Sequence, residues 1–270
     1  MGHWVKRLMG LLAATYLSCH ATAVAQTGLG SSGWGHLRGK IVVSGEFPEA
    51  KKKQIPAGLA ICAEGKSGLT DDSLRIDPAG GLADVFIMLI NEDTQVALPI
   101  HPGYRLQQEQ PVTLEFSNCR LRPHAVCLLA NQDLVLQNRD EVGHHCHMDG
   151  LHNHDNLLIA RSSEYSLQFQ QPERIPLKIH CGIHPWVDGL VLIKDHPYNV
   201  LSQTDGQFEI RNLPPGTWKF MFWHSKTGYL NEMHVPGFQV SRQGEIKVPI
   251  SGGSTVDLGQ IILPSEAFKE

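Results

Sequence analysis

One cysteine and two histidines in this chain have the types and the spacing of a metal centre. Cys181 and His184 lie three residues apart on a predicted loop that follows the apolar strand Pro176–His180, and His144 lies about 37 positions upstream on another predicted loop. A thiolate and two imidazoles are the ligand set of a trigonal copper site. Such a set, held by a rigid scaffold, suits a copper ion that changes oxidation state with little rearrangement. The predicted chemistry is therefore single-electron transfer.

More histidines follow directly after His144. They are His145, His147, His152 and His154. One interpretation is a second, looser copper or zinc site, with Asp149 or Asp155 as oxygen donors. The other is a solvated surface that gains charge below about pH 6.5.

The first 25 residues have the pattern of an export signal. Two basic residues precede the apolar run Leu8–Leu17, and the small residues Ala23–Ala25 form a cleavage site. That run is too short to span a membrane, and no later stretch approaches the roughly 20 apolar residues of a transmembrane helix. We therefore expect a periplasmic or extracellular protein. Cys19 leaves a lipoprotein cleavage site as an alternative.

Export changes how the cysteines are interpreted, because disulfides persist outside the cytosol. The chain has six cysteines, and five remain once the signal is removed. An odd number leaves one thiol free, as a metal ligand or for a bond to another chain. Cys181 is the thiol we expect to be free, although a buried structural thiol or a disulfide partner is the alternative. Sequence does not decide among the three pairings of the other four, and the one we favour is Cys62–Cys119 with Cys127–Cys146.

The elements that must position these residues are short strands. Apolar or alternating runs rich in β-branched residues, separated by Gly, Pro, Asn and Asp, recur along the chain, and helical periodicity is scarce. This pattern predicts an all-β fold of sandwich or barrel layers. The predicted strands are 40–43, 82–90, 112–116, 125–129, 134–137, 165–169, 176–180, 190–193, 207–210, 218–223, 245–250 and 256–263.

Two sets of motifs resemble known families. The arrangement N-x-D-x₃-H-H from Asn138, followed by C-x-I-H-P-W from Cys181, resembles the cupredoxin (blue copper) domain, and more narrowly that of exported bacterial proteins of the methylamine-utilisation-like type. Thr204–Phe208 and Leu213–Trp218 resemble the turns of a carboxypeptidase-regulatory or transthyretin-like module, which is non-catalytic. The resemblance covers about two thirds of the chain, from Leu82 to Leu263.

The resemblance implies a cupredoxin-like Greek-key β-sandwich plus a transthyretin-like β-sandwich. It also implies that His144 and His184 are the imidazole ligands of copper and that Cys181 is the thiolate. The expected organisation is a signal peptide (1–25), a linker (26–36), an N-terminal β segment (37–81), a copper domain (82–197) and a transthyretin-like domain (198–264).

The chain departs from the cupredoxin pattern at Val187. This residue stands where the family has a weak axial methionine, and valine cannot bind a metal. Three interpretations follow: a three-coordinate copper with a raised reduction potential, a distant oxygen ligand from the carbonyl of Gly143, or a site that has lost its metal. Met148 is a further candidate for the axial ligand.

Composition narrows the function classes. Lys plus Arg (23) against Asp plus Glu (27) gives a formal charge of −4, which lacks the basic excess typical of nucleic-acid binding. No hydrolase or nucleotide-binding motif is found, so we do not expect an enzyme. We expect an electron carrier whose Pro185 and Trp186 form an apolar patch beside His184 for redox partner proteins. The alternatives are a cell-surface or polysaccharide-binding β-sandwich with a structural or vestigial metal site, and metal scavenging by the His-rich segment.

Overall fold

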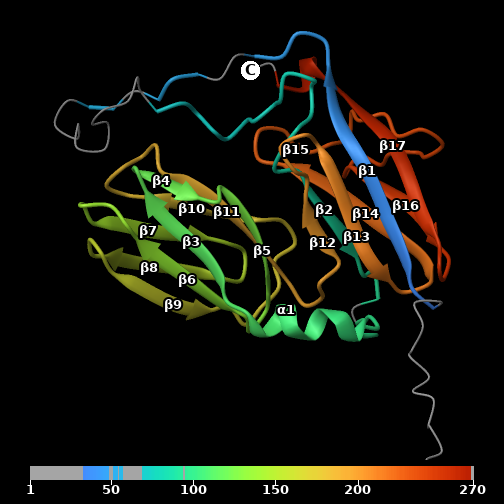
Figure 1. Ribbon diagram of the computed structural model, residues 1–270, viewed down its shortest axis with the longest axis horizontal. Helices are drawn as coiled ribbons and strands as arrows, with labels where there is room; N and C mark the ends of the chain where they lie inside the picture. The colour runs from blue at the N-terminus through green and yellow to red at the C-terminus, as the bar shows by residue number, and fades with distance from the viewer. Residues whose placement is uncertain (1–32, 49–50, 54, 57–68, 94, 269–270) are drawn as a thin grey trace, which may run out of the picture. The chain divides into compact units, whose positions relative to one another are not determined.

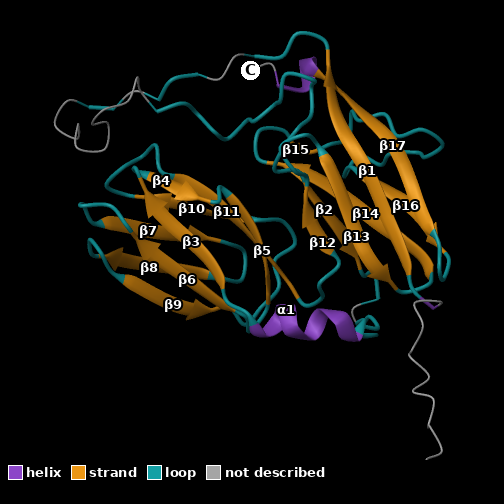
Figure 2. Ribbon diagram, viewed as in Figure 1, coloured by secondary structure: helices purple, strands orange, loops and turns teal. Residues whose placement is uncertain are grey.

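The computed structural model describes residues 33–48, 51–53, 55–56, 69–93 and 95–268. Within these ranges the protein is built of strands, with one short α-helix and two 3₁₀ turns (Figures 1 and 2). The all-β fold class predicted from the short alternating runs is confirmed. The export signal expected over residues 1–25 lies outside the described residues. Among those described, no helix has the length and apolar character that crossing a bilayer requires.

Seventeen strands lie in the described residues. In chain order they are β1 (Gly35–Ser44), β2 (Phe86–Ile90), β3 (Val112–Ser117), β4 (Arg120–Arg122), β5 (Ala125–Leu129), β6 (Asp133–Asn138), β7 (His144–Asp149), β8 (His154–Ile159), β9 (Glu164–Gln168), β10 (Leu177–Cys181), β11 (Asp188–Lys194), β12 (Asn199–Leu201), β13 (Gln207–Leu213), β14 (Gly216–His224), β15 (Gly228–Tyr229), β16 (Glu245–Ile250) and β17 (Thr255–Pro264). The helical segments are η3 (Pro102–Tyr104), α1 (Arg105–Glu109) and η4 (Ser265–Phe268).

The first sandwich joins the two ends of the described chain. One sheet has the order β13-β1-β17, in which β1 runs parallel to β17, and the other has the order β12-β2-β14-β15, with β16 also paired to β14. Apolar side chains from both sheets fill a common core, among them Leu37, Ile87, Phe220 and Leu263. The N-terminal strand therefore completes the sandwich formed by the C-terminal segments.

Strand β2 corrects the expected organisation, in which residues 82–90 began the copper domain. It pairs with β12 and β14, with Met88 opposite Asn199 and Ile87 opposite Phe222. The strand is buried on both faces, because Ile87 and Leu89 enter the core of the first sandwich while Phe86 and Met88 enter a separate apolar cluster. A continuous apolar run shows that a strand is buried but not which sheet receives it.

The second sandwich lies between β2 and β12 in the chain. Its sheets have the orders β5-β11-β10-β7-β8 and β4-β3-β6-β9. The core between them includes Phe116 of β3, Leu136 of β6 and Ile179 of β10, and it also takes in Cys146 and Cys181. This is the sandwich that positions the candidate metal ligands.

The expected disulfides are partly wrong. Cys127 and Cys146 are both free thiols. They lie on β5 and β7, which are three strand spacings apart in the sheet, or about 14 Å, whereas a disulfide needs Cα atoms within about 7 Å. Cys119 is disulfide-bonded, and its expected partner, Cys62, lies outside the described residues.

Candidate metal centre

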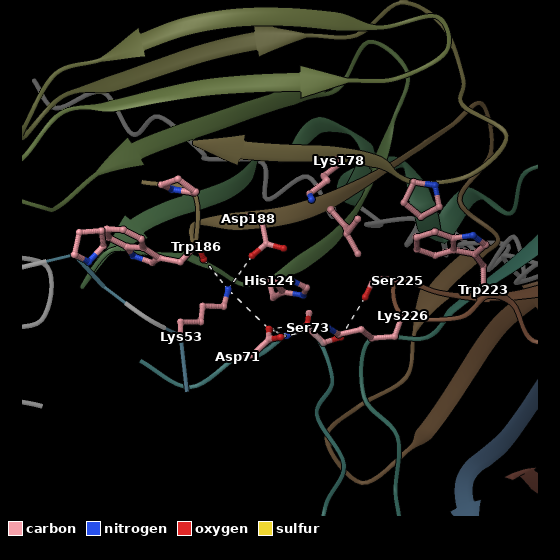
Figure 3. Close-up of a pocket in the computed structure, with 14 residues that line it drawn as sticks. Lys53, Asp71, Ser73, His124, Lys178, Trp186, Asp188, Trp223, Ser225 and Lys226 are labelled. Carbon is pink, nitrogen blue, oxygen red and sulfur yellow. Dashed lines mark hydrogen bonds and ion pairs between the residues drawn. The ribbon is translucent and has the colours of Figure 1, made fainter. Parts of the chain in front are cut away.

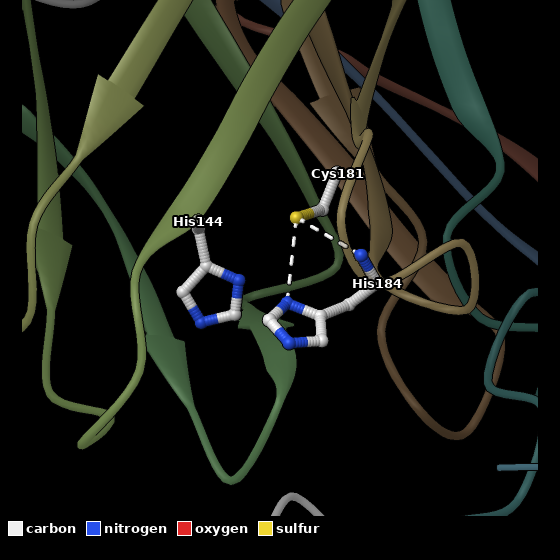
Figure 4. A group of neighbouring side chains, drawn as sticks. All are labelled: His144, Cys181 and His184. Atoms are coloured by element: carbon white, nitrogen blue, oxygen red, sulfur yellow. Dashed lines mark hydrogen bonds between the residues drawn. The ribbon is translucent and has the colours of Figure 1, made fainter. Parts of the chain in front are cut away.

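Two neighbouring strands and the loop after one of them bring the three sequence-predicted ligands together. His144 is the first residue of β7 and Cys181 is the last residue of β10, and these strands are antiparallel neighbours. In both strands alternate side chains are buried, which turns His144 and Cys181 into the core. His184 follows on the loop. One ligand atom from each of the three residues lies within 4.8 Å of the others (Figure 4).

The loop after β10 is held by its own backbone. The N–H of Cys181 donates to the carbonyl of Val187 (2.9 Å), and the N–H of Val187 donates to the carbonyl of His184 (2.8 Å). The N–H of His184 also donates to the Cys181 sulfur at 3.4 Å. These bonds fold residues 181–187 into a closed turn, so that the imidazole of His184 is brought back over Sγ.

The imidazole of His144 is fixed on one side and open on the other. The side chain is 0% exposed, its ring stacks on Phe116 with centroids 4.4 Å apart, and its Nε2 lies 2.9 Å from Oδ2 of Asp140. The other nitrogen, Nδ1, is buried with no hydrogen-bond partner. Because burying an unpaired polar atom is costly, a metal held between this nitrogen, Cys181 and His184 would supply a favourable partner.

A buried asparagine holds the segment that carries Asp140. Asn138 is 1% exposed; its Nδ2 donates to the carbonyls of Val142 and Ala160, and its Oδ1 accepts from the N–H of Asp140. Asp140 in turn accepts from the N–H of Cys119 at 3.0 Å. The carboxylate is thereby aimed at His144 and orients its ring, a role that sequence reasoning did not assign to it.

The electrostatics favour the metal-binding forms of the thiol and of one imidazole. Burial alone would raise the pKa of Cys181, but the His144 imidazole and the backbone N–H of His184 lower it below the ordinary value. Burial and the neighbouring His144 lower the pKa of His184, so its imidazole stays neutral. Burial opposes charge on His144 as well, but Asp140 and then Cys181 raise the pKa of this ring. Thiolate and neutral imidazole are the forms that bind metals.

The spacing of the donors fits a soft metal ion. Sγ of Cys181 and Nδ1 of His184 are 3.5 Å apart. A sulfur and a nitrogen bound to one ion at ordinary lengths and a tetrahedral angle lie about 3.5 Å apart. A second grouping, of Cys119, Asp140 and His144, does not fit, because Cys119 is in a disulfide and Asp140 is engaged by Nε2 of His144. The residues present therefore fit copper at the His144–Cys181–His184 set.

Strand geometry decides one of the axial candidates. Val187 is 1% exposed in the core beside the ligands and has no donor atom. Met148 also faces the core, but it lies four residues after His144 on the same strand, about 13 Å away along β7. The register places Met148 opposite Ile179, two residues beyond the Cys146–Cys181 pair, so the strand geometry does not support Met148 as the axial ligand.

The His-rich segment is not a loop. Residues 144–149 form β7 and 154–159 form β8, with His152 on the short connection between them, and the alternation in β7 places His145 and His147 on the outer face. His154 lies on β8 opposite Asp149, while the exposed His152 faces the carbonyl of Pro172. Sequence reasoning missed His180 of β10, which lies opposite His147. The signal was the alternation of Leu177–Cys181, which places His180 on the face away from the core.

The expected apolar patch beside His184 has different members. His184 is 2% exposed and Trp186 is 8% exposed, so both are buried. Ile183, at 42% exposed, and Pro185 are the apolar side chains that reach the surface of this loop. The indole of Trp186 lies instead near the imidazole of His184, with ring centroids 5.4 Å apart.

A cavity of about 710 Å³ adjoins the loop of His184 (Figure 3). Trp186, Asp188 and Lys53 are among its lining residues. Nζ of Lys53 donates to the carbonyl of Trp186 at 2.6 Å and to Oδ1 of Asp188 at 3.0 Å. The lysine thus ties the end of the ligand loop to a distant part of the chain.

Comparison with known proteins gives similarity to part of the chain only. No protein-family model matches it, and no curated protein matches it. Among solved structures, the copper-containing nitrite reductase from Thermus scotoductus SA-01 is 17% identical, with a TM-score of 0.29 over 36% of this chain, which spans 27% of the reductase. Amicyanin from Paracoccus versutus is 14% identical (TM-score 0.28, 40% of this chain and 96% of amicyanin). A purple cupredoxin from Nitrosopumilus maritimus is 16% identical (TM-score 0.27, 30% of this chain and 98% of that protein). These neighbours are cupredoxins or contain copper, and the assignment of the ligands depends on the geometry above.

Proposed function

We propose that the protein binds one copper ion through His144, Cys181 and His184 and passes single electrons between redox partners. The observation that carries this proposal is the buried Nδ1 of His144, which has no hydrogen-bond partner and lies beside a thiol with a lowered pKa. The ring nitrogens of the buried His124 also lack hydrogen-bond partners, but only the open nitrogen of His144 lies beside a thiol and a second imidazole. A site built for a metal leaves one nitrogen open.

The side chains around the centre have separate tasks. Asp140 accepts a hydrogen bond from the Nε2–H of His144. This bond fixes the tautomer of the ring and leaves the lone pair of Nδ1 directed at the centre. The turn of residues 181–187 fixes His184 against Cys181. When bound, copper supplies the one-electron redox chemistry. Strands β7 and β10 and the turn of residues 181–187 limit the rearrangement of the ligands, which would otherwise slow electron transfer.

The exposed residues around His184 indicate where an electron could pass to a redox partner. His184 is the ligand on the loop, and Ile183 and Pro185 on either side of it are the exposed apolar residues. A redox partner protein that packs on these two side chains would lie close to the imidazole without displacing it. We place the protein in the periplasm or outside the cell, as its N-terminal sequence pattern indicates, and assign it no catalytic reaction.

Absorption spectroscopy tests this proposal. The copper-loaded wild-type protein is expected to show an intense thiolate-to-copper band, and Cys181→Ser should abolish it. Cys146→Ser is the matched control, because Cys146 is a free, buried thiol directly opposite Cys181 on β7. A colourless wild-type protein would overturn the proposal and favour a β-sandwich binding module with a vestigial site. A band lost equally in both variants would mean that Cys181 has no special role.

A further inference from the structure

We propose that the outer face of β7 and β10 holds a second metal site, for a divalent ion that prefers imidazole nitrogen, such as Cu²⁺ or Zn²⁺. Its ligands are His145, His147 and His180. Side chains of one strand alternate between the two faces of a sheet, so these three histidines lie on the face opposite the buried centre. The second site does not rest on the function proposed for that centre.

The first two ligands are already spaced for chelation. His145 and His147 are two residues apart on β7, so their side chains share a face, and their ring centroids are 4.2 Å apart. Nδ1 of His145 lies 3.3 Å from Nε2 of His147. Two imidazole nitrogens bound to one tetrahedral ion at about 2.0–2.1 Å also lie about 3.3 Å apart. One ion can therefore take the place of the hydrogen bond between the two rings without a shift of β7.

The third ligand comes from the neighbouring strand. His180 is opposite His147 in the β7–β10 register, and the two rings stack with centroids 5.0 Å apart and planes 9° apart. Nδ1 of His180 lies 3.3 Å from Oδ2 of Asp149. A carboxylate at one ring nitrogen fixes the tautomer and leaves the other nitrogen for a metal. The side chain is 37% exposed, so its ring can turn toward the pair without a cost in core packing.

A glycine makes room for the histidine pair. A Cβ atom at Gly182 would lie 2.8 Å from Nε2 of His147 and 3.1 Å from Nδ1 of His145, which are the same two nitrogens that face each other. Gly182 is exposed and its N–H donates to the carbonyl of His145. Any larger residue would push the rings apart, so the glycine belongs to the outer site as much as to the loop that follows Cys181.

Electron paramagnetic resonance of the protein loaded with two equivalents of Cu²⁺ tests the second site. We expect two signals in the wild type: one with the narrow hyperfine splitting of a thiolate-bound copper, and one with the wide splitting of a nitrogen-ligated copper. His145→Asn/His147→Asn should remove only the wide signal, and Cys181→Ser should remove the narrow one. Zn²⁺ should compete for the outer site only in large excess, because imidazole ligands bind Cu²⁺ more tightly than Zn²⁺. The dissociation constant of the second equivalent should rise more than about 10-fold in the double variant, since even the loss of an outer-shell partner has that effect.

The matched control is His152→Asn, because His152 is an exposed histidine of the same segment that contacts the carbonyl of Pro172 instead of another ring. It should retain both signals. A wild-type protein that shows no wide signal, or a wide signal that survives in the double variant, would overturn the second site. A wild-type protein that shows the wide signal without the narrow one would contradict the proposal for the buried centre but not the proposal for the outer site. The experiment therefore tests the two proposals independently.

Discussion

Both faces of the β7–β10 pair carry histidines, but in different surroundings. On the inner face, His144 and Cys181 are buried among apolar side chains and held by Phe116 and Asp140. On the outer face, His147 and His180 stack on each other at the surface. The inner donors are positioned before a metal arrives, whereas the outer donors are free to adjust to one. A thiolate and buried surroundings together distinguish the centre proposed for electron transfer from the outer site proposed for ion binding.

The largest effect on this contrast is expected for Asn138→Ala. Asn138 is buried and bonds the backbone of Val142, Ile159 and Asp140, and alanine would remove the partner of the buried Ile159 carbonyl and of the two partly buried groups. The free energy of unfolding should fall by roughly 3 kcal/mol, because each unsatisfied buried group costs about 1–3 kcal/mol. Denaturant unfolding of the metal-free protein measures this. Asn156→Ala, at an exposed position on β8, should change stability by no more than about 0.5 kcal/mol.

The next effect is on copper affinity. Asp140→Asn keeps the shape of the side chain but removes the charge that orients His144, so the affinity of the inner centre for copper should fall about 10–100-fold. Competition with a chelator of known affinity measures the change. Asp149→Asn is the counterpart on the outer face, where the carboxylate faces His180. The inner centre should not respond to it, and an equal loss in both variants would erase the distinction between the faces.

A smaller change is expected in reduction potential. Val187→Met would place a thioether beside the ligands at the position of an axial donor, and a weak axial sulfur should lower the potential relative to a centre without one. The larger side chain should also cost about 1–3 kcal/mol of stability, because Val187 is fully packed. Redox titration of the copper band follows the shift. An unchanged potential would mean that residue 187 does not face the metal.

The smallest effect is expected when a histidine of the outer face is replaced and the absorption of the inner centre is measured. His147→Asn should leave the thiolate-to-copper band unchanged in position and intensity, since the side chain of His147 points away from the core. Visible absorption of the copper-loaded protein checks this. A shift of the band would show that the two faces are coupled through the backbone of β7.

Much of the fold follows from local pattern. The runs 112–116 and 125–129 predict β3 and β5 to within a residue, because alternation and turn residues are local signals. The sheet that receives β2 is not predictable in this way, since all of Phe86–Leu89 is buried. Pairing between distant strands also decides that Cys127 and Cys146 stay apart.

The site was predictable where spacing within the chain matters. Cys181 and His184 are joined by a short turn, and the motif shows them directly. The placement of β7 was not predictable. Its residues His144–Asp149 are mostly polar, so the sequence shows no apolar alternation, although His144, Cys146 and Met148 face the core. Burial of Trp186 was also not predictable, because its neighbour Pro185 is exposed and a loop has no regular alternation of buried and exposed residues.

The parallel pairing of β1 with β17 has a consequence for the order in which the chain folds. The first sheet needs Gly35–Ser44 and Thr255–Pro264 together, so it cannot close until the chain has been made as far as Pro264. The inserted sandwich from β3 to β11 needs nothing beyond Lys194 for its strand pairing. The second sandwich, which carries the candidate ligands, can therefore fold first, and the first sandwich can be completed only after β17 has been made.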